Sequence, residues 1–103
     1  MATTQAFETA LTSFVQGAQA IVDAHMSAYH PTLSRRTLSV EPGRRYARVV
    51  KNDGGVYCFV DITNGDILKA ANWKQPAKHA RGNIYTTTDL SKAVNHYGAL
   101  YLR

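Results

Sequence analysis

Apolar residues near the amino terminus recur at alternating spacings of four and three, the pattern of one helix face. They predict a helix over residues 3–29, whose stripe consists of Phe7, Leu11, Phe14, Ala18, Ile21, His25 and Ala28. Thr3 or Thr4 is suited to cap its start, and His30-Pro31 predicts its end, because the residue before a proline avoids the α region. We expect this stripe to pack on a sheet. The alternative for so regular a seven-residue spacing is pairing with a second copy of the helix in a homodimer.

Two turn dipeptides, Asp53-Gly54 and Asn64-Gly65, lie between runs of β-prone residues. Both tolerate positive φ at the two centres of a type I′ turn, so they predict two hairpins that share the strand 56–62. Two-residue loops predict the pairs Val50–Tyr57, Val49–Cys58, Arg48–Phe59 and Ala47–Val60, and then Ile62–Ile67, Asp61–Leu68, Val60–Lys69 and Phe59–Ala70. With a strand at 37–40 and a turn at 41–43, residues 37–71 are predicted to form an antiparallel meander.

This register divides the meander into two faces. The predicted core face carries Ala47, Val49, Cys58, Val60, Ile62, Ile67 and Ala71, with Lys69 as the misfit. The other face carries Tyr46, Arg48, Val50, Tyr57, Phe59, Asp61, Leu68 and Ala70. We expect the helix to leave this second face to a ligand or another subunit, because large exposed apolar patches usually mark interaction sites. It would stack bases, or it would form a second packed layer.

Residues 72–88 are predicted to form a basic loop. Within it, Pro76 to Gly82 has a proline suited to the first position of a helical turn and a glycine suited to its stop. Such a turn would place Lys74, Lys78 and Arg81 on one side, beside Trp73. Cations beside an aromatic plane are typical of single-strand binding, since the base stacks while the phosphate is neutralised. The alternative is that Trp73 closes the open end of the sheet and the cations keep the loop soluble.

Residues 89–103 are predicted to form a short helix over 90–96, capped by Thr88 or Asp89 and stopped by Gly98, and then a final strand. The chain as a whole predicts one α+β domain over residues 1–103. In it, a long amino-terminal helix packs on an antiparallel meander sheet of four or five strands, and a short helix lies near the carboxy terminus.

Positive charge is concentrated in the predicted sheet and its loops. The first 34 residues hold two of the seven acidic residues and none of the twelve Lys and Arg, although the net charge is +5. Such a basic region favours an anionic partner, most often nucleic acid. Arg35-Arg36 and Arg44-Arg45 flank the strand 37–40, so we expect them near each other, either as solvated charges or as phosphate contacts. The candidate nucleic-acid or anion-binding residues are Trp73, Lys74, Lys78, His79, Arg81, Arg48, Tyr57, Phe59, Arg44 and Arg45.

Catalytic and metal-binding signatures are missing from the sequence. There is no closely spaced Cys/His set, no phosphate-binding glycine loop and no serine elbow. His79 has no second acid or base placed beside it, so we expect no catalytic residue, no metal, no cofactor and no enzyme activity. No apolar window approaches a membrane span, no secretory signal opens the sequence, and Cys58 is expected to be a buried hydrophobe. These features predict a soluble protein of a reducing, cytoplasmic compartment.

The run GDILKAANWKQPAKHARGNIY, with VYCFVD before it and YGALYLR at the end, resembles a family of small uncharacterised proteins encoded by tailed bacteriophages. The resemblance covers residues 40–103, and its specific part is Gly65-Asp66, Lys69, Trp73-Lys74, Pro76-Ala77-Lys78 and Arg81-Gly82-Asn83. It implies a protein that acts in the cytoplasm of an infected bacterium, and it implies no chemistry. Three functions stay open: binding of single-stranded or sequence-tolerant nucleic acid, binding of a small anionic ligand such as a nucleotide second messenger, and a structural or oligomerisation role.

Overall fold

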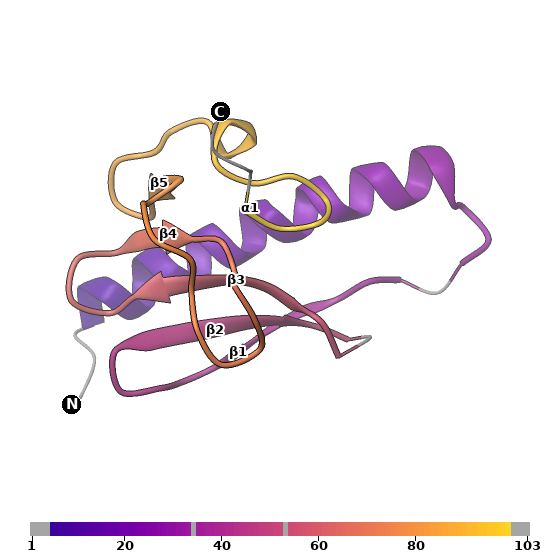
Figure 1. Ribbon diagram of the computed structural model, residues 1–103. Coiled ribbons are helices and arrows are strands. Elements are labelled where there is room, and N and C mark those ends of the chain that lie inside the picture. Colours follow the sequence, from indigo (N-terminus) through magenta and orange to yellow (C-terminus); the bar gives the residue numbers. More distant parts are fainter. Residues whose placement is uncertain (1–4, 34, 53, 100–103) are drawn as a thin grey trace.

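The computed structural model describes residues 5–33, 35–52 and 54–99, and it contains one long helix and one five-stranded antiparallel sheet (Figure 1). The elements are α1 (Gln5–Tyr29), β1 (Leu38–Glu41), β2 (Tyr46–Lys51), β3 (Val56–Asp61), β4 (Asp66–Leu68), β5 (Gly82–Asn83) and the 3₁₀ turn η1 (Leu90–Lys92). Each strand pairs with the next one along the chain, in the order β1-β2-β3-β4-β5. The α+β meander predicted from the sequence is therefore confirmed.

Helix α1 covers one face of the sheet and ends at Tyr29, directly before His30-Pro31, as predicted. Its buried residues are Phe7, Leu11, Phe14, Ala18 and Val22. The predicted stripe is wrong only at its end, since Ala28 is exposed, whereas Ile21 is partly buried against the core beside the buried Val22. Figure 1 shows that the carboxy-terminal turns of α1 extend past the end of the sheet. Thr3 and Thr4, the proposed caps, lie outside the described residues.

The first hairpin follows the predicted register except near its turn. Three predicted pairs are present, but Val50 pairs with Val56 because the register shifts between Val49 and Val50. The hairpin closes where the Lys51 N–H donates to the Gly55 carbonyl at 2.8 Å and the Gly54 N–H donates to the Lys51 carbonyl at 2.9 Å. Its loop is thus three residues long, with Gly54 at a φ of 95°, the bulged type of hairpin loop rather than type I′. Asp53 itself lies outside the described residues.

The second hairpin also has a longer loop than predicted. Phe59 pairs with Leu68 and Val60 with Ile67, two positions away from the predicted partners. The Asp61 carboxylate accepts from the Thr63 N–H at 2.9 Å and from the Thr63 hydroxyl at 2.6 Å, and the Gly65 N–H donates to the Asp61 carbonyl at 2.7 Å. This side-chain turn at Asp61 replaces the predicted two-residue turn. A slip of two positions leaves every side chain on its original face, so the predicted faces survive the error.

The core lies between α1 and the predicted core face. It comprises Phe7, Leu11, Phe14, Ala18, Val22, Ala47, Val49, Tyr57, Cys58, Val60, Ile67, Ala93, Val94 and Ala99. The bulge explains why Tyr57 is among them, because an extra residue on β3 rotates this side chain to the core side. The prediction that Tyr57 shares a face with Phe59 is therefore wrong. Lys69, the misfit of this face, directs its ammonium to the Ala99 carbonyl at 3.2 Å.

The opposite face is left by α1, as predicted, but the chain covers it with its own loop. Figure 1 shows the segment between β4 and β5 crossing in front of the sheet. Phe59 is only 2% exposed on this face, and Val50 and Leu68 are buried. The expected open aromatic surface is wrong, because the loop after β4 provides the second packed layer.

The carboxy-terminal part is less regular than predicted. Only η1 replaces the expected helix over 90–96, although Asp89 caps it as predicted by accepting the Ser91 N–H at 3.1 Å. Strand β5 lies inside the predicted loop, where Gly82 lets it approach its neighbours: a Cβ at this position would lie 2.8 Å from the Ala93 Cβ. Of the predicted final strand, Ala99 forms an isolated bridge with Val94, and the rest lies outside the described residues.

Candidate anion-binding site

A cationic hollow lies between the β1–β2 loop and the segment after β4. It has a volume of about 190 Å³ and is lined by Glu41, Pro42, Gly43, Arg44, Arg45, Tyr46, Arg48, Phe59 and Lys74. Four of these side chains are cationic and one is acidic. We call this site the arginine hollow.

The β1–β2 hairpin brings three of the four cations to the hollow, two from its loop and Arg48 from β2. Its turn needs a glycine, because a Cβ on Gly43 would lie 2.5 Å from the Tyr46 carbonyl oxygen. Antiparallel pairing then places Arg48 opposite Glu41, and their side chains form an ion pair of 2.8 Å between Nη1 and Oε1. The one acid of the hollow is thereby held by one of its cations.

The remaining cations of the hollow carry an excess of positive charge. Arg45 Nε lies 3.5 Å from the buried Asp61 carboxylate, and its guanidinium extends over the Tyr46 ring at 5.3 Å from the centroid. The Arg45 side chain nevertheless stays 66% exposed. Within the described residues, neither Arg44 nor Lys74 forms an ion pair. An anion entering the hollow would thus meet two cations that are not paired with an acid.

Trp73 stands at the rim of the hollow. The Arg48 guanidinium lies over its ring at 4.7 Å from the centroid and over the Phe59 ring at 5.8 Å, so one cation is held by two aromatic rings. The Asn72 carboxamide oxygen accepts the N–H groups of Lys74 at 2.8 Å and Gln75 at 3.0 Å, which fixes the tip of the loop. Trp73 is 43% exposed. It partly covers the sheet and still has ring surface open to a ligand.

Lys78, His79 and Arg81 do not join this hollow in the way predicted. The segment 76–82 is not helical, because its backbone pairs with β4 instead: the Ala77 N–H donates to the Lys69 carbonyl at 2.7 Å, and the Arg81 N–H donates to the Ile67 carbonyl at 2.8 Å. Pairing with the sheet therefore determines the structure of this segment, although its sequence favours a helical turn. The prediction that these cations line one side of a helical turn is wrong.

The three residues instead have separate environments. Lys78 and His79 line a neighbouring hollow of about 350 Å³ that also contains Asp61 and Asp66. The Arg81 guanidinium turns back to donate to the carbonyls of Lys78 at 2.7 Å and His79 at 2.6 Å. Both arrangements make these side chains weaker candidates for an anion site than Arg44 and Lys74.

The two aromatic candidates on β3, Tyr57 and Phe59, are buried. The Tyr57 hydroxyl donates to the Asn95 carbonyl at 2.6 Å, and burial raises its pKa. Phe59 forms a wall of the arginine hollow and meets Tyr46 edge-on, with ring centroids 6.2 Å apart. The neighbouring Cys58 is buried, as predicted, and burial raises the pKa of its thiol.

The two arginine pairs lie at opposite ends of β1, so the expectation that they are neighbours is wrong. Arg44-Arg45 belongs to the arginine hollow, whereas Arg35-Arg36 lies near Asn52 at the other end. Sequence reasoning missed Glu41 and Tyr46 as members of the hollow. The structure pairs Glu41 with Arg48 across the six residues 42–47, a longer connection than the turn at 41–43 predicted from the sequence.

In the part of the chain that the structure describes, no three His, Cys, Asp or Glu side chains are arranged to hold a metal ion. The helices described there include none with the length and apolar character needed to span a membrane.

The chain belongs to a family whose model, described as Family of unknown function (DUF7717), matches residues 2–100. No curated protein and no solved structure matches it. Family membership therefore assigns no activity to the arginine hollow, and the resemblance to tailed-phage proteins stays a prediction.

Proposed function

Since membership of this family carries no activity, we propose from the site itself that the protein binds nucleic acid, single-stranded or sequence-tolerant, in the cytoplasm of a phage-infected bacterium. The observation that carries the proposal is the arginine hollow, where four cations surround one small space beside a half-exposed tryptophan. The location in an infected cell rests on the sequence resemblance alone.

The two kinds of contact in this site have different roles. Arg44, Arg45 and Lys74 neutralise phosphates of the backbone, and the open part of the Trp73 ring stacks a base, worth ~1–3 kcal/mol per base. Arg48 holds the indole from one side and is itself paired with Glu41, so it supports the stack instead of meeting the phosphate.

Recognition of this kind is tolerant of sequence. Phosphate contacts carry no base information, and every base has a π-face that can stack on tryptophan. The proposed ligand is therefore a flexible single strand, whose unpaired bases reach the ring without the cost of opening a duplex.

The test is the salt dependence of binding to short oligonucleotides, measured by fluorescence anisotropy. Three phosphate contacts at a slope of about −0.7 each predict that affinity falls about a hundredfold for each tenfold rise in salt. The double variant Arg44→Gln/Lys74→Met should retain roughly one contact and a slope near −0.7. Arg45 is left in place because its removal would strip Asp61 of its partner.

A matched control separates the site from the general charge of the protein. Lys74→Met and Lys92→Met remove one exposed lysine each, and Lys92 lies in η1, outside the hollow. Only Lys74→Met should weaken binding, and both variants should keep the melting temperature of the parent, because exposed charges contribute little to stability. Equal binding by the two variants, or no binding by the parent at low salt, would rule out this function and favour the small-ligand or oligomer alternatives.

A further inference from the structure

A second cationic hollow lies at the opposite end of β2, away from the arginine hollow. Its volume is about 310 Å³, and it is lined by Val22, His25, Met26, His30, Leu33, Arg36, Lys51, His96 and Tyr97. It shares no lining residue with the arginine hollow. Among the described residues, no acidic side chain lines it, so three imidazoles, a guanidinium and an ammonium face one space. We call it the histidine hollow.

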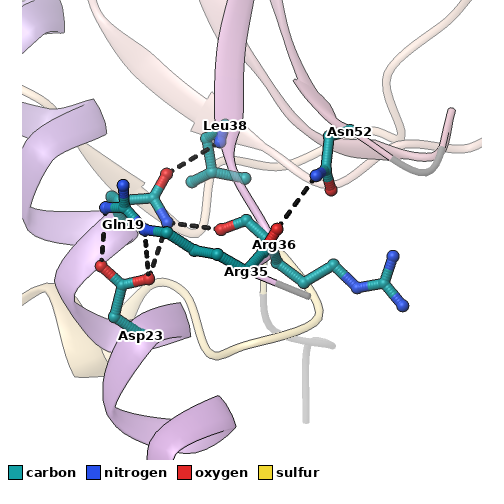
Figure 2. Close-up of polar contacts among 6 residues, drawn as sticks. All are labelled: Gln19, Asp23, Arg35, Arg36, Leu38 and Asn52. Carbon is teal, nitrogen blue, oxygen red and sulfur yellow. Dashed lines mark hydrogen bonds and ion pairs between the residues drawn. The ribbon is translucent and has the colours of Figure 1, made fainter. Parts of the chain in front are cut away.

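The acid on the adjoining part of α1 is already neutralised. Asp23 accepts two hydrogen bonds from the Arg35 guanidinium, 3.1 Å from Nε and 2.9 Å from Nη2, which lower the pKa of its carboxyl group (Figure 2). Figure 2 shows the Arg36 side chain directed away from this pair.

The backbone that carries Arg36 is held on both sides. The Gln19 carboxamide donates to the Arg36 carbonyl at 2.6 Å and accepts the Leu38 N–H at 2.8 Å, and these two bonds hold residues 36–38 against α1. On the other side, the Asn52 side chain donates to the Arg35 carbonyl at 3.0 Å. Residues 35–38 thus have a fixed position between α1 and the end of β2 (Figure 2).

The loop that carries His96 and Tyr97 is fixed as well. The Asn95 carboxamide oxygen accepts the N–H groups of Tyr97 at 2.8 Å and Gly98 at 3.3 Å, and the Asn95 carbonyl accepts the Tyr57 hydroxyl. Gly98 has a φ of 143°, and a Cβ there would overlap the Tyr57 carbonyl. Both walls of the hollow are thus formed before any ligand arrives, which lowers the entropic cost of binding.

The histidines in this hollow are close enough to repel one another when charged. The rings of His25 and His96 stack with centroids 3.5 Å apart and planes 4° apart, and the His30 ring centroid lies 5.7 Å from that of His25. Desolvation, and after it the positive charges of His25, His30 and Lys51, lower the pKa of His96. A bound anion would relieve the repulsion among these groups.

Exposed apolar groups gather at the same place. Leu33 is 57% exposed and Tyr97 is 72% exposed, and both line the hollow, while the Tyr29 ring, 71% exposed, lies 4.9 Å from the His25 ring at a tilt of 38°. A ligand in the hollow therefore meets cationic groups together with aromatic and aliphatic surface. The volume is at the lower end of the range of small-molecule sites, about 300–1,000 Å³.

We propose that the histidine hollow binds a nucleoside monophosphate, with its phosphate between Arg36 and Lys51 and its base against Tyr97 and the apolar wall. The charge complement matches a phosphate and the aromatic wall matches a base. The site is independent of the proposed nucleic-acid function, because its residues belong to a different end of the sheet.

Binding at this site is coupled to protonation. An anion stabilises the imidazolium form of His96, so the ligand raises the pKa of His96, and the affinity for the ligand increases as the pH falls from about 8 to about 6.5. The range stops at about 6.5 because the phosphate loses its second charge near pH 6.

The test uses adenosine monophosphate and NMR titration of the histidine ring protons. We expect the ligand to raise the His96 pKa and to bind about tenfold more tightly at pH 6.5 than at pH 8. Lys51→Met should weaken binding about tenfold, and the control Lys92→Met should not. Inorganic phosphate and adenosine should each bind about tenfold more weakly than the monophosphate, since each provides half of the contacts.

Two further variants separate this proposal from the others. His96→Gln should keep the affinity seen at pH 8 and lose the increase at pH 6.5, while its circular dichroism stays that of the parent. Arg44→Gln/Lys74→Met should bind adenosine monophosphate normally even though it loses oligonucleotides. An unchanged His96 pKa, equal affinities of Lys51→Met and Lys92→Met, or equal binding of inorganic phosphate would overturn the proposal.

Discussion

The two faces of the sheet come from alternate residues of the same strands, yet they are covered in different ways. Helix α1 covers one face with Phe7, Phe14 and Val22, which are 2–3% exposed. The loop after β4 covers the other face with Trp73, which is 43% exposed and rests on the Arg48 guanidinium. The helix covers its face with buried apolar side chains, whereas the loop leaves its face partly exposed and includes a charged group.

The difference comes from what a helix and a loop can bury. A helix presents an apolar side chain every three or four residues and satisfies its own backbone, so its whole stripe can be apolar. A loop must satisfy its backbone through side chains and neighbouring strands, as the segment after β4 does through Asn72 and through β4 itself. We infer that the helix-covered face carries most of the stability, and that the loop-covered face is where a ligand can compete.

The largest expected effect is on the helix-covered face. Phe14→Ala removes a ring that is 3% exposed, and it should lower the free energy of unfolding by ~3–5 kcal/mol. Urea unfolding followed by circular dichroism measures this loss. The folded fraction should bind oligonucleotides as the parent does, because Phe14 lies across the sheet from the arginine hollow. A loss of less than about 1 kcal/mol would contradict the comparison between the faces.

A smaller effect should appear at alkaline pH. Burial raises the pKa of the Cys58 thiol in the folded state, whereas the thiol of the unfolded chain ionises near pH 8.5. The folded protein therefore loses stability as the pH rises above about 8.5, by about 1.4 kcal/mol per pH unit from this group. Tyr57, whose pKa is also raised by burial, adds to the slope above about pH 10.

The control for this pH effect is Cys58→Ala, which has no thiol to ionise. Its free energy of unfolding should be lower than that of the parent at pH 7 and should stay level between about pH 8.5 and 10. If the free energies of unfolding of parent and variant change in parallel with pH, burial does not raise the pKa of the Cys58 thiol.

The smallest effect on stability is expected on the loop-covered face. Trp73→Ala removes a half-exposed ring and its cation–π contact with Arg48, and should cost about 1 kcal/mol of stability. The same variant should lower oligonucleotide affinity about tenfold, since one stacked base is lost. Trp73→Phe keeps an aromatic plane and should recover part of the affinity. A stability loss as large as that of Phe14→Ala would show that the loop carries as much of the fold as the helix does.

The order of the elements and most of the strand faces follow from the sequence alone. Helix α1, its end before Pro31 and the core face of β2 and β3 all follow from local periodicity and turn residues. The face assignment tolerated a wrong loop length at Asn64-Gly65, because a slip of two residues returns each side chain to its face. A slip of one does not, and the bulge on β3 moved Tyr57 to the core.

The way in which the second face is covered, and the places where the cations gather, depend on tertiary contacts. The segment 76–82 is not helical, because its backbone hydrogen-bonds to the β4 segment. In the same loop, Trp73 contacts the Arg48 guanidinium. The arginine hollow joins a β1–β2 loop to Lys74, and the histidine hollow joins the end of α1 to residues 96–97. Such groupings depend on contacts between residues far apart in the chain, which hydrophobic periodicity does not encode, because periodicity specifies a face and not the segment that comes to cover it.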